Sequence, residues 1–119
     1  MSNETPGIEI DLTPEYKRNL RELSKKYRKI RVDTMPILEQ IQLGNFIGDR
    51  IPGMGENYFI LKVRVKNSNI QKGKSAGYRL IYQVESTNSV LLLTIYSKSE
   101  REDITPNEIL SILAEFEQD

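Results

Sequence analysis

Residues 59–66 read FILKVRVK, and this stretch decides the fold. Phe59 and the aliphatic residues alternate with Lys62, Arg64 and Lys66, the period-2 pattern of a β-strand that turns its apolar side chains toward a core. Two further β-rich runs follow, YRLIYQVE at 78–85 and VLLLTIYSK at 90–98, and the turn-like STNS at 86–89 joins them. The three runs together predict an antiparallel meander.

Helical patterns flank the meander on both sides. Apolar residues recur at steps of three and four from Tyr16 to Ile30, after an N-cap and first-turn proline at Thr13-Pro14, and predict one long basic helix. We expect Asp33 to cap a second helix, with Pro36 in its first turn and Gly44 at its end. The breaker-rich stretch 44–56 reads as a loop, and Ile8 to Leu12 alternates like a strand.

A last helix is predicted after residue 105. The sequence Thr105-Pro106-Asn107-Glu108 is a capping box, Ile104 and Ile109 suit its hydrophobic staple, and Ile109, Ile112, Leu113 and Phe116 share one face. The expected fold class is therefore α+β, with an N-terminal helical hairpin packed on an antiparallel β-sheet and a C-terminal helix. We expect residues 1–7 to be a flexible N-terminus and residues 8–119 a single domain.

Composition restricts the chemistry. The 119 residues contain no cysteine and no histidine, which removes the thiol nucleophile, the imidazole base and the imidazole metal ligand. The absence of cysteine fits a reducing compartment, so we expect a cytoplasmic protein, and no apolar run is long enough to span a membrane, so we expect no membrane partner. Lysine, arginine, tyrosine and carboxylates are left to carry any catalysis, with no cofactor.

Charge is distributed unevenly, although the net charge is zero. Eight basic residues and one acid lie between Tyr16 and Arg31, and six basic residues with no acid lie between Phe59 and Arg79. Lys62, Arg64 and Lys66 should share a sheet face, because side chains two apart point the same way. A solvated face is the ordinary explanation of such a pattern, but the absence of acids favours contact with phosphate groups without base specificity.

Three segments resemble the RelE/ParE toxin superfamily, and most closely its HigB-like branch. They are KVR at 62–64, KGKSAGYRLIY at 72–82 and LLTIYSKSE at 92–100, and the likeness extends from about Tyr16 to the C-terminus. The resemblance implies a RelE-like fold and the toxin of a bacterial type II toxin–antitoxin system. It also implies a ribosome-dependent mRNA endoribonuclease, which inhibits translation until a cognate antitoxin protein covers its basic surface.

The resemblance also assigns roles to residues. Lys62 and Arg64 match a lysine and an arginine on the first hairpin strand, Arg79 matches the Gly-x-Arg position, and Lys98 matches a basic position after the last strand. Ser99 stands where RelE itself often has arginine, and Thr105 stands where a tyrosine begins the last helix. The implied catalytic set is Lys62, Arg64, Lys74, Arg79 and Lys98, with Lys66, Lys72 and Tyr96 as RNA contacts.

These residues suit a reaction without metal, in which the ribose 2′-hydroxyl attacks the adjacent phosphate. We expect Arg64 and Arg79 to stabilise the charge that develops on the phosphate oxygens. We also expect crowding among cations to lower the pKa of a lysine so that it can act as the base. The sequence does not decide which lysine of the implied catalytic set is the base and which is the acid. Tyr96 is equally well an ordinary strand tyrosine or a platform for base stacking.

Other interpretations remain open. A ParE-like inhibitor of DNA gyrase would share the fold without needing catalytic residues, and a catalytically inactive RNA-binding relative would keep only the basic surface. The acidic run Glu100, Glu102 and Asp103 is more typical of a solvated segment or a helix N-terminus than of a metal site. The basic helix face can meet solvent, ribosomal RNA or the antitoxin.

Overall fold

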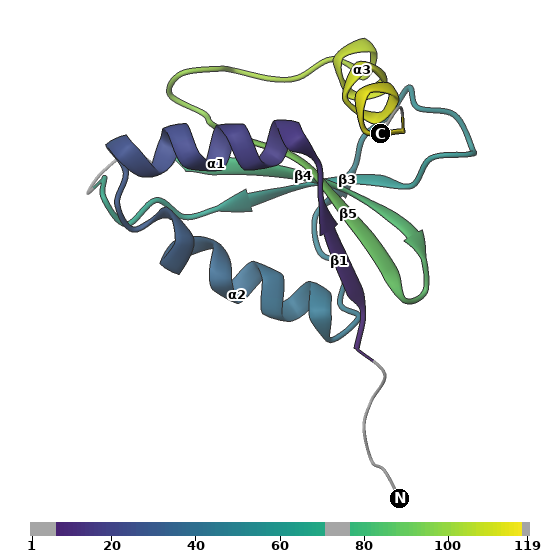
Figure 1. The fold of residues 1–119 in the computed structure, drawn as a ribbon, viewed down its shortest axis with the longest axis horizontal. Helices are drawn as coiled ribbons and strands as arrows, with labels where there is room; N and C mark the ends of the chain where they lie inside the picture. Colours follow the sequence, from purple (N-terminus) through teal and green to yellow (C-terminus); the bar gives the residue numbers. More distant parts are fainter. Residues whose placement is uncertain (1–6, 71–76, 118–119) are drawn as a thin grey trace, which may run out of the picture.

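The computed structural model describes residues 7–70 and 77–117, which form an α+β domain (Figure 1). The expected flexible N-terminus therefore lies outside the described residues except for Gly7, as do Lys72 and Lys74. In chain order the elements are β1 (Glu9–Leu12), α1 (Pro14–Lys26), α2 (Ile30–Gln42), β2 (Asp49–Arg50), β3 (Ile60–Val65), β4 (Tyr78–Ser86), β5 (Ser89–Ser97) and α3 (Pro106–Glu117).

The predicted meander forms the centre of the sheet, whose strand order is β1-β5-β4-β3-β2. Strands β3, β4 and β5 are antiparallel neighbours, and a tight turn between the paired residues Ser86 and Ser89 joins the last two, as predicted. The sheet is mixed rather than purely antiparallel, because β1 pairs in parallel with β5 from Glu9↔Ser89 to Leu12↔Leu92. The sequence pattern identifies β1 as a strand, whereas its partner and direction depend on contacts distant in sequence.

Helix α1 begins as predicted but ends early. The Thr13 hydroxyl accepts a hydrogen bond from the Tyr16 amide at 3.0 Å, as an N-cap should. The helix was expected to continue to Ile30, but it ends at Lys26 with Tyr27 as its C-cap. Tyr27 packs edge-on against the ring of Tyr78, with centroids 5.7 Å apart, and this contact with the sheet accompanies the turn between the helices.

The start of α2 also differs from the prediction. The helix starts at Ile30, before Asp33, and Pro36 lies inside it rather than in its first turn. Asp33 does not cap the helix, because its carboxylate accepts hydrogen bonds from the amide (2.9 Å) and hydroxyl (3.0 Å) of Ser68, beyond β3. Gly44 ends the helix region with a φ of 91°, a conformation that suits glycine.

Both faces of the sheet are partly covered, which the alternating pattern did not indicate. One core lies between the sheet and the α1–α2 hairpin, and a second lies between the opposite face and α3. Ile60 is fully buried in the second core, whereas Phe59, expected inside, is 39% exposed and lies 4.9 Å from the guanidinium of Arg50. Apolar residues before and within α3, including the predicted pair Ile104 and Ile109, are buried there. Among the described helices, none combines the length and apolar character needed to cross a membrane.

Candidate nucleic-acid interface

The face of the sheet that α3 partly covers carries the basic residues of β3. Leu61, Val63 and Val65 are buried against the helical hairpin, so Lys62 and Arg64 project to the opposite face. Lys66, just beyond the strand, is exposed and continues the alternation. The shared face predicted for the three basic residues is thus a direct consequence of the strand period.

The register of the meander extends this group across three strands. Arg64 of β3 lies directly opposite Arg79 of β4, and Arg79 lies directly opposite Tyr96 of β5. We call Arg64, Arg79 and Tyr96 the arginine row. Arg79 therefore shares a sheet face with Lys62, as the assignment of both to one site requires.

A glycine allows β3 and β4 to come together at this end. A Cβ added at Gly77 would lie 2.5 Å from the backbone oxygen of Val65, a distance that real side chains do not tolerate. The Lys98 amide donates to the Gly77 oxygen at 2.9 Å, which ties the end of β5 to the same point. The Gly-x-Arg spacing thus has a structural reason, because the glycine permits the close approach that sets Arg79 on the row.

Arg79 is a buried cation without a carboxylate partner in the described part of the chain. Only 8% of the residue is exposed, and its Nη1 donates to the backbone oxygen of Tyr78 at 3.2 Å. Burial, followed by the nearby Arg64 guanidinium, lowers the pKa of Arg79, and Tyr96 and the Asp103 carboxylate oppose part of this shift. Like charges directly opposite each other on a ladder are destabilising, and so is an unpaired buried charge. The row can recover this cost by binding an anion.

Lys62 has a neighbour that the sequence did not suggest. Its Nζ lies 3.2 Å from Oδ1 of Asp103, which comes from the segment between β5 and α3. The hydrogen bond from the Ile104 amide, followed by Lys62, lowers the pKa of Asp103. The expected crowding of Lys62 by other cations is thus offset by a carboxylate, and Lys74, another cation of the predicted catalytic set, lies outside the described residues.

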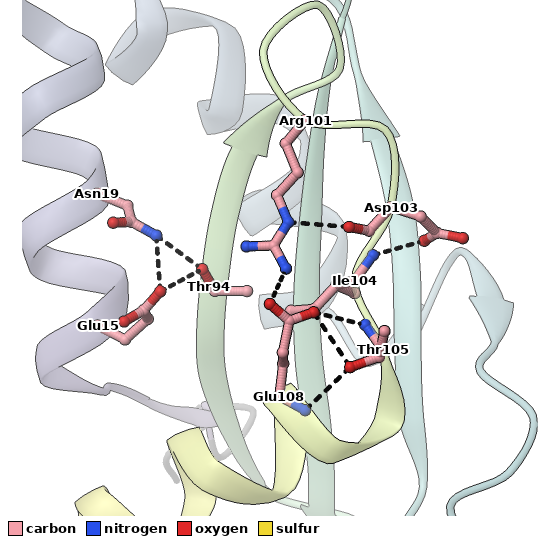
Figure 2. A network of polar contacts seen from close by, with 8 residues as sticks. All are labelled: Glu15, Asn19, Thr94, Arg101, Asp103, Ile104, Thr105 and Glu108. Atoms are coloured by element: carbon pink, nitrogen blue, oxygen red, sulfur yellow. Dashed lines mark hydrogen bonds and ion pairs between the residues drawn. The ribbon is translucent and has the colours of Figure 1, made fainter.

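The remaining basic residues of the site come from the segment after β5, which crosses the sheet face (Figure 2). Lys98 donates from Nζ to the backbone oxygen of Glu102 at 2.6 Å. Arg101 lies over the Tyr96 ring at 5.5 Å, donates from Nε to the backbone oxygen of Asp103 at 2.8 Å, and forms an ion pair with Glu108. Arg101 was not among the predicted site residues.

Tyr96 is placed differently from an open stacking platform. Only 6% of the residue is exposed, and Arg101 lies against its ring. Its hydroxyl is buried and has no hydrogen-bond partner in residues 7–70 or 77–117, and burial raises its pKa. A base can stack on this ring only if Arg101 moves aside. In the structure as described, Tyr96 is a buried member of the arginine row that packs beside Arg79.

The acidic run before α3 has several uses. Glu100 pairs with Lys26 of α1 at 2.8 Å, and Asp103 pairs with Lys62. The predicted capping box is present, because the Thr105 amide donates to Glu108 at 2.9 Å and the Glu108 amide donates to the Thr105 hydroxyl at 3.2 Å.

A second polar contact joins α1 to β5. The side-chain amide of Asn19 donates to Glu15 at 3.0 Å and to the hydroxyl of Thr94 at 2.9 Å (Figure 2).

Asp103 and Arg101 could be found only through the fold. In the sequence they belong to a charged stretch that resembles a solvated helix approach, and no spacing rule relates position 103 to position 62. A scan against protein-family models finds no match for this chain. The described geometry defines a class of site, a cationic sheet face in an α+β domain. We call it the cationic face; Lys62, Arg64 and Arg79 form it, and it is suited to holding a phosphate.

We predict that the pKa of Asp103 responds only partly to Lys62. Lys62→Met should raise the pKa of Asp103 toward its ordinary value of about 3.9 without reaching it, because the Ile104 amide still stabilises the carboxylate. Since folding lowers this pKa, the stabilisation is present above about pH 3.9 and is lost as the pH falls through the lowered value. Carboxyl-carbon NMR titration measures it. Arg64→Met is the matched control, and an unchanged Asp103 titration in Lys62→Met would contradict the ion pair.

Proposed function

We propose that this protein is the toxin of a bacterial type II toxin–antitoxin system and cleaves mRNA on the ribosome without a metal ion. The observation that carries the proposal is Arg79, a buried arginine without a carboxylate partner among the described residues, directly opposite Arg64. A protein keeps such an arrangement when function requires it, because the fold alone is destabilised by it. The family resemblance of residues 62–64, 72–82 and 92–100 supports the same function.

In the proposed reaction, the 2′-hydroxyl oxygen of one ribose bonds to the neighbouring phosphorus, and the bond from phosphorus to the 5′-oxygen breaks. One lysine takes the 2′-hydroxyl proton, and another group returns a proton to the 5′-oxygen. The products are a 2′,3′-cyclic phosphate and a free 5′-hydroxyl. Arg64 and Arg79 stabilise the charge on the non-bridging oxygens, which is commonly the largest contribution to catalysis.

Lys62 and Lys98 are the described lysines that can exchange these protons. Each is held on or beside the cationic face, Lys62 by Asp103 at 3.2 Å and Lys98 by the Glu102 oxygen at 2.6 Å. In this scheme one of the two takes the 2′-hydroxyl proton and the other returns a proton to the 5′-oxygen.

Ribosome dependence follows from charge. A chain with no net charge and one local group of cations contacts few phosphates, and salt at cellular strength weakens each contact. Free RNA should therefore bind weakly. On the ribosome the message is already held in place, so orientation replaces affinity. A cognate antitoxin that supplies carboxylates to the cationic face would neutralise it in the cytoplasm.

The test is primer extension on a translated message, with ribosomes present or omitted. We expect cleavage with ribosomes and little on naked RNA, because positioning on the ribosome contributes what the weak electrostatic contacts lack. Prior incubation of the protein with chelator, followed by return to ribosome buffer, should leave the rate unchanged. The fragment ends should carry a cyclic phosphate and a 5′-hydroxyl.

Four results would redirect the proposal. Equal cleavage of naked RNA would remove the ribosome from the mechanism. Loss of activity after chelation, restored by one metal, would replace the lysine mechanism. Absence of cleavage together with gyrase-dependent DNA breaks would support the ParE-like alternative, and ribosome binding without either activity would indicate an inactive RNA-binding relative.

A further inference from the structure

A hollow of ≈350 Å³ lies beside Lys62, and nothing in the proposed chemistry uses it. Its walls include Ile51, Pro52 and Ile104, and its polar lining includes Asp49, Lys62 and Asp103. The volume falls within the range of small-molecule sites, which combine apolar walls with a few polar groups. The hollow opens next to a residue of the cationic face, where a nucleotide bound through its phosphate would place its base.

Of the two carboxylates that line the hollow, Asp49 is the one that is free to act. It lies on β2 directly opposite Lys62 on the ladder to β3. Gly48 brings β2 to this position, because a Cβ there would lie 2.7 Å from the Lys62 oxygen. Asp103 is engaged by Lys62 and by the Ile104 amide, whereas Asp49 makes no hydrogen bond or ion pair through its side chain within the described ranges 7–70 and 77–117.

We infer that the hollow binds a guanine base, with Asp49 accepting hydrogen bonds from it. A carboxylate has two acceptor oxygens and no donor, and the Watson–Crick edge of guanine presents two adjacent donors, N1–H and the N2 amino group. Adenine, cytosine and uracil each offer only one donor on that edge. Pro52, Ile51 and Ile104 supply flat and aliphatic surface against the ring, and Lys62 offsets the phosphate charge.

This inference rests on the proposed function for its biological setting, because it makes the base a neighbour of the cleaved phosphate. The same chemistry would also suit a free guanine nucleotide. Two assays separate these sources. One measures binding of the four nucleoside 5′-monophosphates, which differ only in the base, and the other maps cleavage positions across a translated message of mixed sequence.

In the binding assay, NMR titration of the wild-type protein should show GMP bound about tenfold more tightly than AMP, CMP or UMP, a typical discrimination for one bidentate contact. Asp49→Asn should remove the preference for GMP, because a side-chain amide presents one donor and one acceptor, and each of the four bases offers an acceptor and a donor that match such a pair. The matched control is Asp11→Asn, an exposed aspartate on β1 at the other edge of the sheet, which should leave the preference unchanged.

The outcomes distinguish the site from the reaction. Equal affinity for the four nucleotides in the wild type would overturn the inference, and so would a GMP preference that survives in folded Asp49→Asn. Preference for GMP without any RNA cleavage would support the site, reject the proposed function and identify a free guanine nucleotide as the ligand. Cleavage enriched beside G in the wild type, with that enrichment lost in Asp49→Asn, would support both.

Discussion

Arg79→Met should abolish most of the cleavage on ribosomes while making the protein more stable. We expect the cleavage rate to fall about 10² to 10³-fold, the usual loss when one preorganised group that stabilises transition-state charge is removed. The free energy of unfolding should rise by about 1 kcal/mol, because an unpaired buried cation opposite Arg64 is replaced by an apolar side chain of similar length. Single-turnover cleavage and urea denaturation measure the two effects.

Opposite signs for activity and stability identify a functional charge. The control for stability is Arg31→Met on α2, an exposed arginine outside the arginine row, which should change the unfolding free energy by less than about 0.5 kcal/mol. Ribosome binding by Arg79→Met should change little, since its partner in the proposal is charge that develops during the reaction. Full cleavage by this variant would exclude Arg79 from the chemistry, and a loss of stability would show that the buried charge has a stabilising partner.

Gly77→Ala should cause the largest loss of stability. The added Cβ would approach the Val65 oxygen to 2.5 Å, and because that oxygen belongs to the backbone, β3 and β4 must separate to relieve the contact. We expect the free energy of unfolding to fall by about 2–3 kcal/mol, as for other overpacked sites. Because the same strand end carries Arg79, cleavage should fall as well, even below the temperature at which the variant unfolds.

The comparison that isolates this contact is Gly7→Ala. There the nearest atom to an added Cβ is Nε2 of Gln42 at 3.1 Å, the far end of a flexible side chain, so the loss should stay within about 0.5 kcal/mol. Thermal and urea unfolding of both variants give the values. Wild-type stability in Gly77→Ala would show that β3 and β4 can separate at this end without cost, and the structural reason given for the Gly-x-Arg spacing would fail.

Local periodicity and local hydrogen bonding were sufficient to predict those parts of this protein that depend on neighbours in sequence. Side chains two apart on a strand must share a face, so the stretch at 59–66 placed Lys62 with Arg64. The Thr13 N-cap, the turn at 86–89 and the Thr105–Glu108 capping box are likewise formed within a few residues. Each could be predicted because its donor and acceptor are only a few residues apart, so the local backbone conformation alone brings them together.

Tertiary structure decided what depends on partners distant in sequence. The end of α1 at Lys26 goes with the contact between Tyr27 and Tyr78, and Asp33 bonds Ser68 instead of capping a helix. The parallel pairing of β1 required the free edge of β5. At the site, the sequence alone determined which cations share the strand face. Only the fold brought Asp103 to Lys62 and Arg101 to Tyr96, because the path of residues 98–105 over the sheet is set by the packing of α3 against the second core.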